Sequence, residues 1–283
     1  MYSQPISLSL KCLLNPYAIL HEIGHALGLV HEHTRMDRDK FIEIDHNQLD
    51  NLGKYNFLIR NNSVYKNYST SYDYASIMHY SPYDFGSFWK KLFRYPVMKS
   101  KLYEQYTWMM GQTEKMTFND YKKINLCHCK INNNTTKCKN NGYPDFKNCS
   151  KCICPSGYTG DNCKKIISSD PKCGNTIFKA NKTNVPLIYV GKINCYIFLK
   201  AKKNKKILLT VYYINAPPYK NGICVESNAF QIKYRRDKGT TGLLLCGHDS
   251  RVLKIISESR SILVFYKGID GHSMLAFQFK EVN

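Results

Sequence analysis

Three histidines and one glutamate in a short stretch of this chain have the spacing of a metal site. His21 and His25 are four residues apart, so on an α-helix both imidazoles lie on one face and can reach a single ion. Glu22 lies about 100° around the same helix, near enough to hold a water molecule on that ion. Gly28 can adopt a positive φ and turn the chain back, which lets His31 complete the site. Three neutral protein ligands with an open fourth position are typical of a catalytic zinc ion.

A longer pattern surrounds these residues. The full string HExxHxxGxxH, followed by the stretch SIMHY at residues 76–80, is much rarer than a lone HExxH and is the metzincin signature. Residues 21–44, HEIGHALGLVHEHTRMDRDKFIEI, and residues 72–80, YDYASIMHY, closely resemble the astacin family of zinc endopeptidases. The resemblance implies one zinc ion per chain and the hydrolysis of peptide bonds in a protein or peptide substrate.

The resemblance also implies a role for each matching residue. The zinc ligands would be His21, His25 and His31. Glu22 would be the general base that takes a proton from zinc-activated water, and Tyr80 would be a displaceable further ligand that stabilises the oxyanion. Met78 would form an apolar platform beneath the metal, and Glu32 would anchor the amino terminus of the mature enzyme. Ordinary core packing is the alternative for Met78, and Tyr80 is one of 22 tyrosines.

Local signals predict the helices that position this site. Asn15 and Pro16 suit an N-cap and a first helical position, so a helix is expected over 16–27 with Gly28 as its stop. Thr117 and Asp120 resemble a capping box, which predicts a closing helix at about 118–126.

The amino-terminal side of the metal helix is short. In the astacin family a twisted sheet covers this helix and mostly precedes it, whereas only 20 residues precede His21 here. We therefore expect an α+β metzincin catalytic domain over residues 1–127 that is N-terminally incomplete and lacks most of that sheet.

The composition is that of a multidomain extracellular protein. The chain has 283 residues, 43% of them apolar, and its twelve cysteines show no CxxC…CxxC zinc pattern, so they indicate disulfides and an oxidising compartment. No stretch approaches about 18 consecutive apolar residues, so no transmembrane segment is expected. The first residues, MYSQPISLSLKCLLN, show no clear signal peptide, and secretion is expected from the family and the cysteines.

The net charge of +20 favours anionic partners, but the lysines are scattered and no nucleic-acid motif accompanies them, so no nucleic-acid partner is expected. The densest run contains Lys200, Lys202, Lys203, Lys205 and Lys206. A solvated strand edge that blocks unwanted strand pairing is the simpler interpretation of this run. Binding of a heparin-like polyanion is the alternative, and it would weaken steeply with salt.

Residues 128–164 resemble a small EGF-like module. Their cysteines end in the pattern C-x-C-x8-C, with the turn PSGYTG at 155–160 inside it. The resemblance implies the disulfides Cys129–Cys149, Cys138–Cys152 and Cys154–Cys163. So small a unit depends on its crosslinks for stability, because it can bury little apolar surface.

Residues 173–282 alternate short apolar strands with turns, which predicts an all-β sandwich. Their cysteines resemble those of a CUB domain and imply the disulfides Cys173–Cys195 and Cys224–Cys246. The aspartates of a calcium-binding CUB domain are missing near the second pair, so no calcium is predicted. A CUB domain of such an enzyme usually recognises a protein partner. Cys12 and Cys127 remain without assigned partners unless they pair with each other.

Two functions of different classes are consistent with this sequence. The first is a secreted zinc-dependent metalloendopeptidase. The second is a catalytically impaired fragment that acts as an extracellular EGF–CUB binding protein, which the missing sheet and the unassigned cysteines favour. The sequence leaves open the substrate, the cleavage preference, the CUB ligand and the oligomeric state.

Overall fold

The structure is a computed structural model of the chain that describes residues 5–6, 8, 10, 15–60, 65–87, 92–93, 95–128, 137–148 and 150–283. The chain divides into two compact units, residues 1–132 and 133–283. Within the described ranges, no helix has the length and apolar character needed to cross a membrane.

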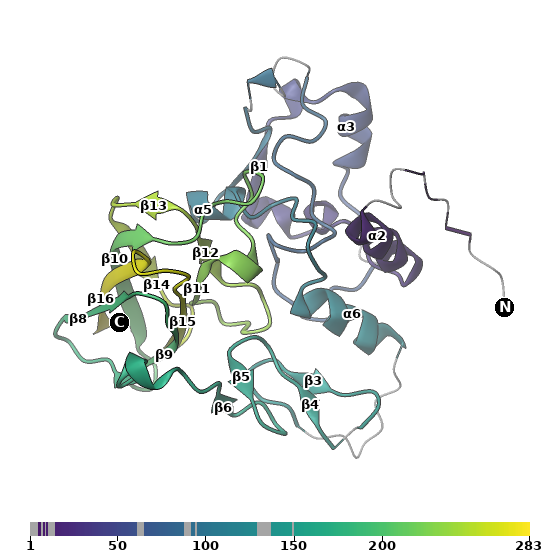
Figure 1. The fold of residues 1–283 in the computed structure, drawn as a ribbon. Coiled ribbons are helices and arrows are strands. Elements are labelled where there is room, and N and C mark those ends of the chain that lie inside the picture. The colour runs from purple at the N-terminus through teal and green to yellow at the C-terminus, as the bar shows by residue number, and fades with distance from the viewer. Residues whose placement is uncertain are drawn as a thin grey trace. The chain divides into compact units, whose positions relative to one another are not determined.

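The first unit consists mainly of helices and loops (Figure 1). The α-helices of this unit whose bounds lie within the described residues are α2 (Pro16–Ala26), α3 (Asn51–Asn56), α5 (Glu104–Thr107) and α6 (Phe118–His128). Short 3-10 helices cover Glu32–Thr34, Arg38–Lys40 and His46–Gln48. Its strands β1 (Ile42–Ile44) and β2 (Met98–Ser100) pair antiparallel, with Ile42 opposite Ser100.

Both predicted helices of this unit are present. In α2 the Asn15 carboxamide oxygen accepts from the backbone N–H groups of Tyr17 and Ala18, at 3.1 and 3.4 Å, and Pro16 follows as the first helical residue. Side chains in the N-cap position commonly satisfy the first free amides of a helix in this way. The helix ends at Ala26, one residue before its predicted end.

The start of α6 is a reciprocal capping box. The Thr117 hydroxyl accepts from the Asp120 amide at 3.3 Å, and a carboxylate oxygen of Asp120 accepts from the Thr117 amide at 3.0 Å. The two side chains therefore satisfy each other's backbone donors, as the sequence pattern predicted. The helix continues to His128, slightly beyond the predicted end.

The second unit begins with a disulfide-rich segment that has little regular structure. Two short antiparallel pairs form there, β3 (Tyr143–Pro144) with β4 (Cys152–Ile153) and β5 (Tyr158–Thr159) with β6 (Lys165–Ile166). Its disulfides are Cys138–Cys152 and Cys154–Cys163, two of the three pairs that the EGF-like resemblance implies. The third pair involves Cys129 and Cys149, which lie outside the described residues, as does Cys12. Cys127 is exposed and forms no disulfide with any cysteine that the structure describes.

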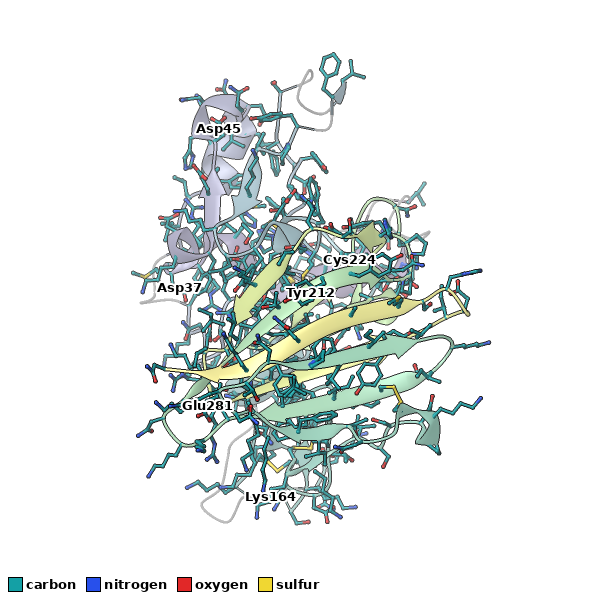
Figure 2. The ribbon with its side chains drawn as sticks, turned by 90° about the vertical axis from the view of Figure 1, so that its left-hand side faces the viewer. Asp37, Asp45, Lys164, Tyr212, Cys224 and Glu281 are labelled. Carbon is teal, nitrogen blue, oxygen red and sulfur yellow. A yellow bond between two sulfur atoms is a disulfide. The ribbon has the colours of Figure 1, made fainter. Side chains whose placement is uncertain are left out.

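The rest of the second unit is a β-sandwich of two five-stranded sheets (Figures 1 and 2). One sheet holds β8 (Val185–Val190), β10 (Lys206–Asn215), β13 (His248–Asp249), β14 (Leu253–Ile256) and β16 (Met274–Val282). The other holds β7 (Ile177–Lys179), β9 (Asn194–Lys200), β11 (Phe230–Lys233), β12 (Leu243–Leu245) and β15 (Ser261–Lys267). Alternate residues are buried in strands β9 and β16, so their apolar faces contribute to the core between the sheets. All-β architecture was the prediction for this region.

Two disulfides crosslink the sandwich region, and the disulfide-rich segment packs against it. The disulfides Cys173–Cys195 and Cys224–Cys246 are those implied by the CUB resemblance. Tyr158 forms a buried cluster with Leu263 and Phe265 of strand β15. The disulfide-rich segment and the sandwich are therefore joined by buried apolar contacts as well as by the chain itself.

Candidate metal centre

Helix α2 presents two of the predicted ligands, and the turn after it returns the third. His21 and His25 lie one helical turn apart on α2, and Gly28 follows with φ +92°. The Gly28 amide donates to the His25 carbonyl oxygen and the Leu29 amide to the Gly24 carbonyl oxygen, each at 2.9 Å. A side chain rarely adopts that φ, so glycine allows the chain to turn here. Three residues later His31 faces the helix again.

The three imidazoles converge on one point. The Nε2 atom of His31 lies 3.2 Å from Nε2 of His21 and 3.3 Å from Nε2 of His25. Ligand nitrogens bound at about 2.0–2.1 Å to a tetrahedral zinc ion are about 3.3–3.4 Å apart. Among the described residues, this is the one group of histidine, cysteine or acidic side chains placed to share an ion.

The opposite ring nitrogens select the tautomer that a metal needs. Nδ1–H of His21 donates to the Ile77 carbonyl oxygen and Nδ1–H of His25 donates to the Leu29 carbonyl oxygen, each at 2.9 Å. These acceptors hold the proton on Nδ1, so each Nε2 keeps its lone pair directed at the common point. The donor set and its orientation therefore fit a zinc ion.

Burial favours the uncharged form of two of these imidazoles, those of His31 and His25. It lowers the pKa of His31 to about 3, with further lowering by the neighbouring His25 and His21. The pKa of His25 is also lowered, first by burial, although its bond to Leu29 opposes the change. A neutral imidazole is the form that binds a metal ion.

Glu22 has a carboxylate available beside this cluster. It is half-buried, and within the described part of the chain its side chain has no hydrogen-bond or ion-pair partner. Its negative charge acts to raise the pKa of His25 and that of Tyr80. In both groups burial has the larger effect, and it lowers the pKa of His25 but raises that of Tyr80. The position and the free oxygens suit a group that exchanges protons with a bound water molecule.

Tyr80 is held by aromatic rings on several sides. Its ring centroid lies 4.0 Å from that of His33, 4.4 Å from that of His31 and 5.2 Å from that of Phe85. Phe57 approaches edge-on at 5.9 Å. Burial, followed by the charge of Asp84, raises the pKa of the Tyr80 hydroxyl, so it keeps its proton at neutral pH. The group is a hydrogen-bond donor beside the histidine cluster.

Met78 packs beneath the helix that carries the ligands. It is 1% exposed and forms a buried cluster with Leu29, Ile77 and Met116. A Cβ atom added to Gly24 would lie 3.0 Å from the Met78 sulfur, tighter than ordinary van der Waals contact. Gly24 therefore permits the close approach of helix α2 and residues 76–80, which are called the methionine turn below.

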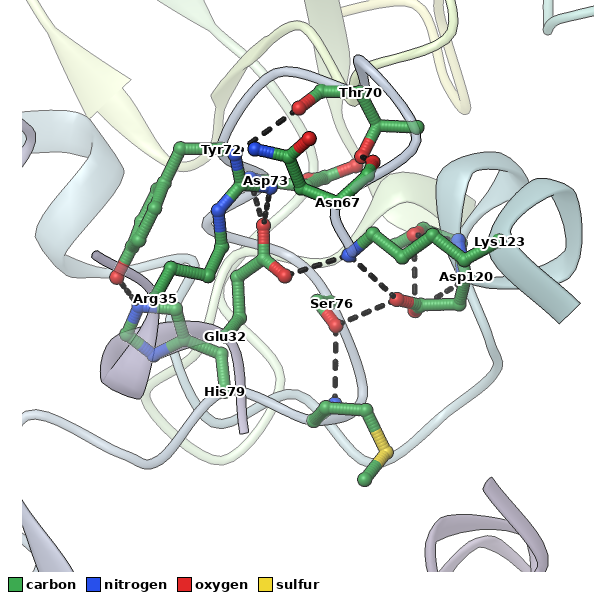
Figure 3. A network of polar contacts seen from close by, with 12 residues as sticks. Glu32, Arg35, Asn67, Thr70, Tyr72, Asp73, Ser76, His79, Asp120 and Lys123 are labelled. Atoms are coloured by element: carbon green, nitrogen blue, oxygen red, sulfur yellow. Dashed lines mark hydrogen bonds and ion pairs between the residues drawn. The ribbon is translucent and has the colours of Figure 1, made fainter. Parts of the chain in front are cut away.

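A buried ionic network supports the turn after His31 (Figure 3). The two carboxylate oxygens of Glu32 bind different cations, Arg35 at 2.9 Å and Lys123 of α6 at 2.7 Å, and one of them also accepts from the Asp73 amide at 3.0 Å. Arg35 additionally binds both oxygens of Asp37 at 2.8 and 2.9 Å. Burial alone would raise the pKa of Glu32, but Lys123 and Arg35 lower it to about 2. The carboxylate thus stays ionised and paired.

Asp120 connects the same network to the methionine turn. Its carboxylate accepts from the Ser76 hydroxyl at 2.8 Å and from the Ile77 amide at 3.3 Å, and the Ser76 oxygen in turn accepts from the Met78 amide at 3.1 Å (Figure 3). The Lys123 ammonium lies 4.0 Å from an oxygen of this carboxylate. Through Asp120, helix α6 thereby fixes the position of the methionine turn beside the histidine site.

Comparison with known proteins agrees with this arrangement. Residues 2–129 match the model of the family described as astacin, a family of peptidases. These residues belong to the astacin family. The chain is 32% identical over 257 residues to zinc metalloproteinase nas-23 of Caenorhabditis elegans, which covers 86% of this chain and 45% of the relative. It is 28% identical over 273 residues to zinc metalloproteinase nas-34 of the same organism, covering 95% of this chain and 43% of the relative.

A solved structure is also similar to part of this chain. This is high choriolytic enzyme 1, a hatching enzyme zinc-protease from the medaka fish Oryzias latipes, with 32% identity and a TM-score of 0.35. The match covers 40% of this chain and 53% of that one. The present chain spans less than half of the length of the two nematode relatives.

Sequence reasoning on the astacin region missed several supporting residues. Asp120 appeared only as a helix cap, and its bonds to the methionine turn connect segments 43 and 44 residues apart in the chain. Lys123 lies 91 residues from Glu32 and gave no local signal of pairing. His33 was visible in the HEHTR stretch, but its position against Tyr80 depends on tertiary packing.

Proposed function

We propose that the astacin region of this chain is a zinc-dependent metalloendopeptidase. The observation that carries the proposal is the convergence of three Nε2 atoms at 3.2 and 3.3 Å, with the Nδ1 protons of His21 and His25 held by backbone carbonyls. His21, His25 and His31 would bind the ion. A bound zinc ion would lower the pKa of water toward about 7 and polarise the scissile carbonyl of a peptide substrate.

Glu22 is the proposed general base. Its unpaired carboxylate accepts a proton from the attacking water and passes it to the leaving amine. The absence of a hydrogen-bond partner for Glu22 among the described residues supports this role, because a carboxylate committed to an ion pair is a weaker base.

Tyr80 is the proposed oxyanion donor and further zinc ligand. Its hydroxyl is protonated at neutral pH and can donate to the oxygen that becomes negative as the carbonyl is attacked. The rings of His31 and His33 support its aromatic ring, which limits the positions that the hydroxyl can take. Such a donor acts on the transition state more than on the ground state and therefore accelerates the reaction.

Met78 and Glu32 have supporting roles in this proposal. Met78 fills the space beneath the helix, consistent with an apolar platform. Glu32 braces the turn that carries His31 through Arg35 and Lys123. Anchoring of a mature amino terminus by Glu32 stays a prediction from the family resemblance.

The remaining modules would serve the extracellular role of the protein. We propose an EGF-like module over 128–164 as a spacer and a CUB domain over 173–282 that binds a protein partner. The four observed disulfides and the β-sandwich support these assignments and a secreted location. A lack of bound calcium stays a prediction.

Zinc content and peptide cleavage test the proposal together. The full chain should bind one zinc ion, measured by elemental analysis after dialysis, and should cleave a casein-type substrate. Glu22→Ala should retain zinc and lose cleavage, whereas Glu43→Ala, which removes an exposed carboxylate from β1, should keep both. Zinc binding without cleavage by the parent chain would favour the EGF–CUB binding protein. Equal cleavage by the parent and Glu22→Ala would overturn the base assignment.

A further inference from the structure

The positive charge of this protein is concentrated in its second unit. Residues 133–283 contain 25 lysines and arginines against 9 acidic residues, which is a net charge of +16 of the total +20. Like charges gathered on one compact unit repel one another and oppose folding. A surface that keeps such a charge therefore needs a physical explanation.

The fold brings much of this charge to one end of the β-sandwich. Strands β7 and β9 are parallel, with Lys179 beside Lys200, and the Ala201 amide donates to the Arg260 carbonyl oxygen at 2.8 Å. At the same end the Glu281 amide donates to the Asn181 carbonyl oxygen at 2.6 Å. The cations of this basic end are Lys179, Lys182, Lys200, Lys202, Lys203, Lys205, Lys206, Arg260 and Lys280.

Three segments that are distant in the chain contribute to a concavity at this end. Lys182 follows β7, Lys205 precedes β10, and Lys280 lies in β16; together they line a hollow of about 320 Å³. Figure 2 shows Glu281, which also lines this hollow, at the end of strand β16. The sequence run 200–206 is therefore part of a larger surface that includes Lys182 and Lys280.

These cations lack acidic partners within the described part of the chain. None of the nine forms an ion pair there, and the Lys205 ammonium donates to the Asn283 carboxamide oxygen at 2.6 Å. The nearby acid Glu281 is 9% exposed and accepts from the Lys202 amide at 2.8 Å. Glu258 is engaged by Arg235 and by the Arg236 amide. The basic end thus presents uncompensated positive charge to solvent.

Protection of strand edges explains only part of this surface. It accounts for Lys179 on the edge strand β7. Lys182, Lys202 and Lys203 lie in turns, where no strand could pair with the chain, and edge protection gives no reason for them. A partner with repeated negative charges would bind all of these positions.

We propose that the basic end binds a linear sulfated polysaccharide. Its flexible lysines match sulfate groups spaced along a chain, which they bind as point charges. The turns 181–184, 201–205 and 258–260 contain no aromatic side chain for stacking nucleic-acid bases and no large apolar side chain for insertion into a bilayer. The disulfides of the unit are typical of an oxidising, extracellular compartment, where such polysaccharides are found.

A charge-matched pair of variants tests the proposal on the full chain. The patch variant carries Lys182→Gln, Lys202→Gln, Lys203→Gln and Lys205→Gln. The control carries Lys139→Gln, Lys147→Gln, Lys151→Gln and Lys164→Gln, four exposed lysines of the disulfide-rich segment with the same change in net charge. Both proteins are treated with an N-glycosidase, because the sequon at Asn181 lies within the basic end.

Binding to a heparin oligosaccharide of defined length is measured at several salt concentrations. The patch variant should bind at least about ten-fold more weakly than the parent, since several exposed ion pairs of ordinary strength multiply to that factor. The control should remain within about two-fold of the parent, and the affinity of the parent should fall as salt rises. An equal loss in both variants would show general attraction by net charge and would overturn the proposal.

Three further probes separate the polysaccharide from other polyanions. Desulfated heparin should bind much more weakly than heparin. A single-stranded oligonucleotide of equal charge and vesicles rich in phosphatidylserine should bind more weakly than heparin and should lose little affinity in the patch variant. Tighter binding of the oligonucleotide or of the vesicles, through the same lysines, would overturn the assignment of a sulfated polysaccharide.

Discussion

The ammonium group of Lys123 lies 2.7 Å from a carboxylate oxygen of Glu32, although the two residues are 91 positions apart. Both side chains are at most 10% exposed. The pair connects helix α6 to the turn that follows His31. The histidine site is thus braced by a charge interaction formed only when the two ends of the astacin region fold together.

Removing the cation of this pair should destabilise the first unit. Lys123→Met leaves the buried Glu32 carboxylate with Arg35 as its one remaining cation. The free energy of unfolding of the first unit should therefore fall by about 3 kcal/mol, the lower end of the range for a broken buried ion pair. Lys54→Met, on the exposed side of α3, should change it by less than about 0.5 kcal/mol. Urea unfolding of both variants measures the difference, and equal stabilities would contradict the role given to the pair.

The same carboxylate should make stability depend on pH in acid. The pKa of Glu32 is about 2 in the folded protein, against 4.5 as its ordinary value. The unfolded chain therefore binds the proton first as pH falls, and the stabilisation present above about pH 4.5 is progressively lost toward pH 2.

Comparison with Glu32→Gln isolates this effect. The parent should have a larger free energy of unfolding than Glu32→Gln at pH 6, and this difference between the two proteins should be smaller at pH 3. Other titrating groups are common to both proteins and cancel, and a chelator removes any contribution from metal binding. A difference that stayed constant or widened toward pH 3 would be inconsistent with the lowered pKa.

The turn at Gly28 should be sensitive to any side chain. A Cβ atom there would meet no neighbour within 4 Å, but φ is +92°, so Gly28→Ala should cost about 1–2 kcal/mol through backbone strain alone. Because the turn sets the position of His31, zinc affinity should fall as well. Gly271→Ala, also in open space but without a positive φ, should be nearly neutral. Calorimetric titration with zinc and thermal unfolding check both effects.

Gly24 should be sensitive for a different reason. Gly24→Val would place new atoms against the Met78 sulfur and the Met116 methyl group, which lie 3.0 and 3.2 Å from the first added carbon. Overpacking of this kind typically costs about 1–3 kcal/mol. In the double variant, Met78→Ala should restore part of the lost stability, because it removes the side chain that the new valine would contact. A double-mutant cycle measures this coupling. Strict additivity would show that the two side chains do not meet.

The hydroxyl of Tyr80 should matter for catalysis rather than for folding. Tyr80→Phe keeps the ring contacts with His31 and His33 and should reduce kcat by about 10²–10³-fold with zinc retained. Its melting temperature should change little. Tyr55→Phe, at an exposed tyrosine, provides the control. Full activity of Tyr80→Phe would remove the hydroxyl from the proposed mechanism.

Local patterns predicted much of the fold. Asn15 and Pro16 located the start of α2, and the Thr117–Asp120 pair located the start of α6, because capping depends on atoms within a few residues. The apolar runs at 207–214 and 275–279 lie within strands β10 and β16. The alternation of apolar runs and turns predicted an all-β region but not which strands pair, because pairing depends on partners distant in the chain.

The amino-acid sequence by itself determined the chemistry of the candidate site. The spacing of His21, His25 and His31 around Gly28 specifies three imidazoles on one helix and one turn, because helical geometry and the φ of glycine are local properties. Only the tertiary structure decided what holds them there: the Ile77 carbonyl that orients His21, the aromatic rings around Tyr80, and the link from Glu32 through Lys123 to Asp120. These contacts join residues tens of positions apart, and such pairs form through burial and charge in the folded chain rather than through any periodicity along it.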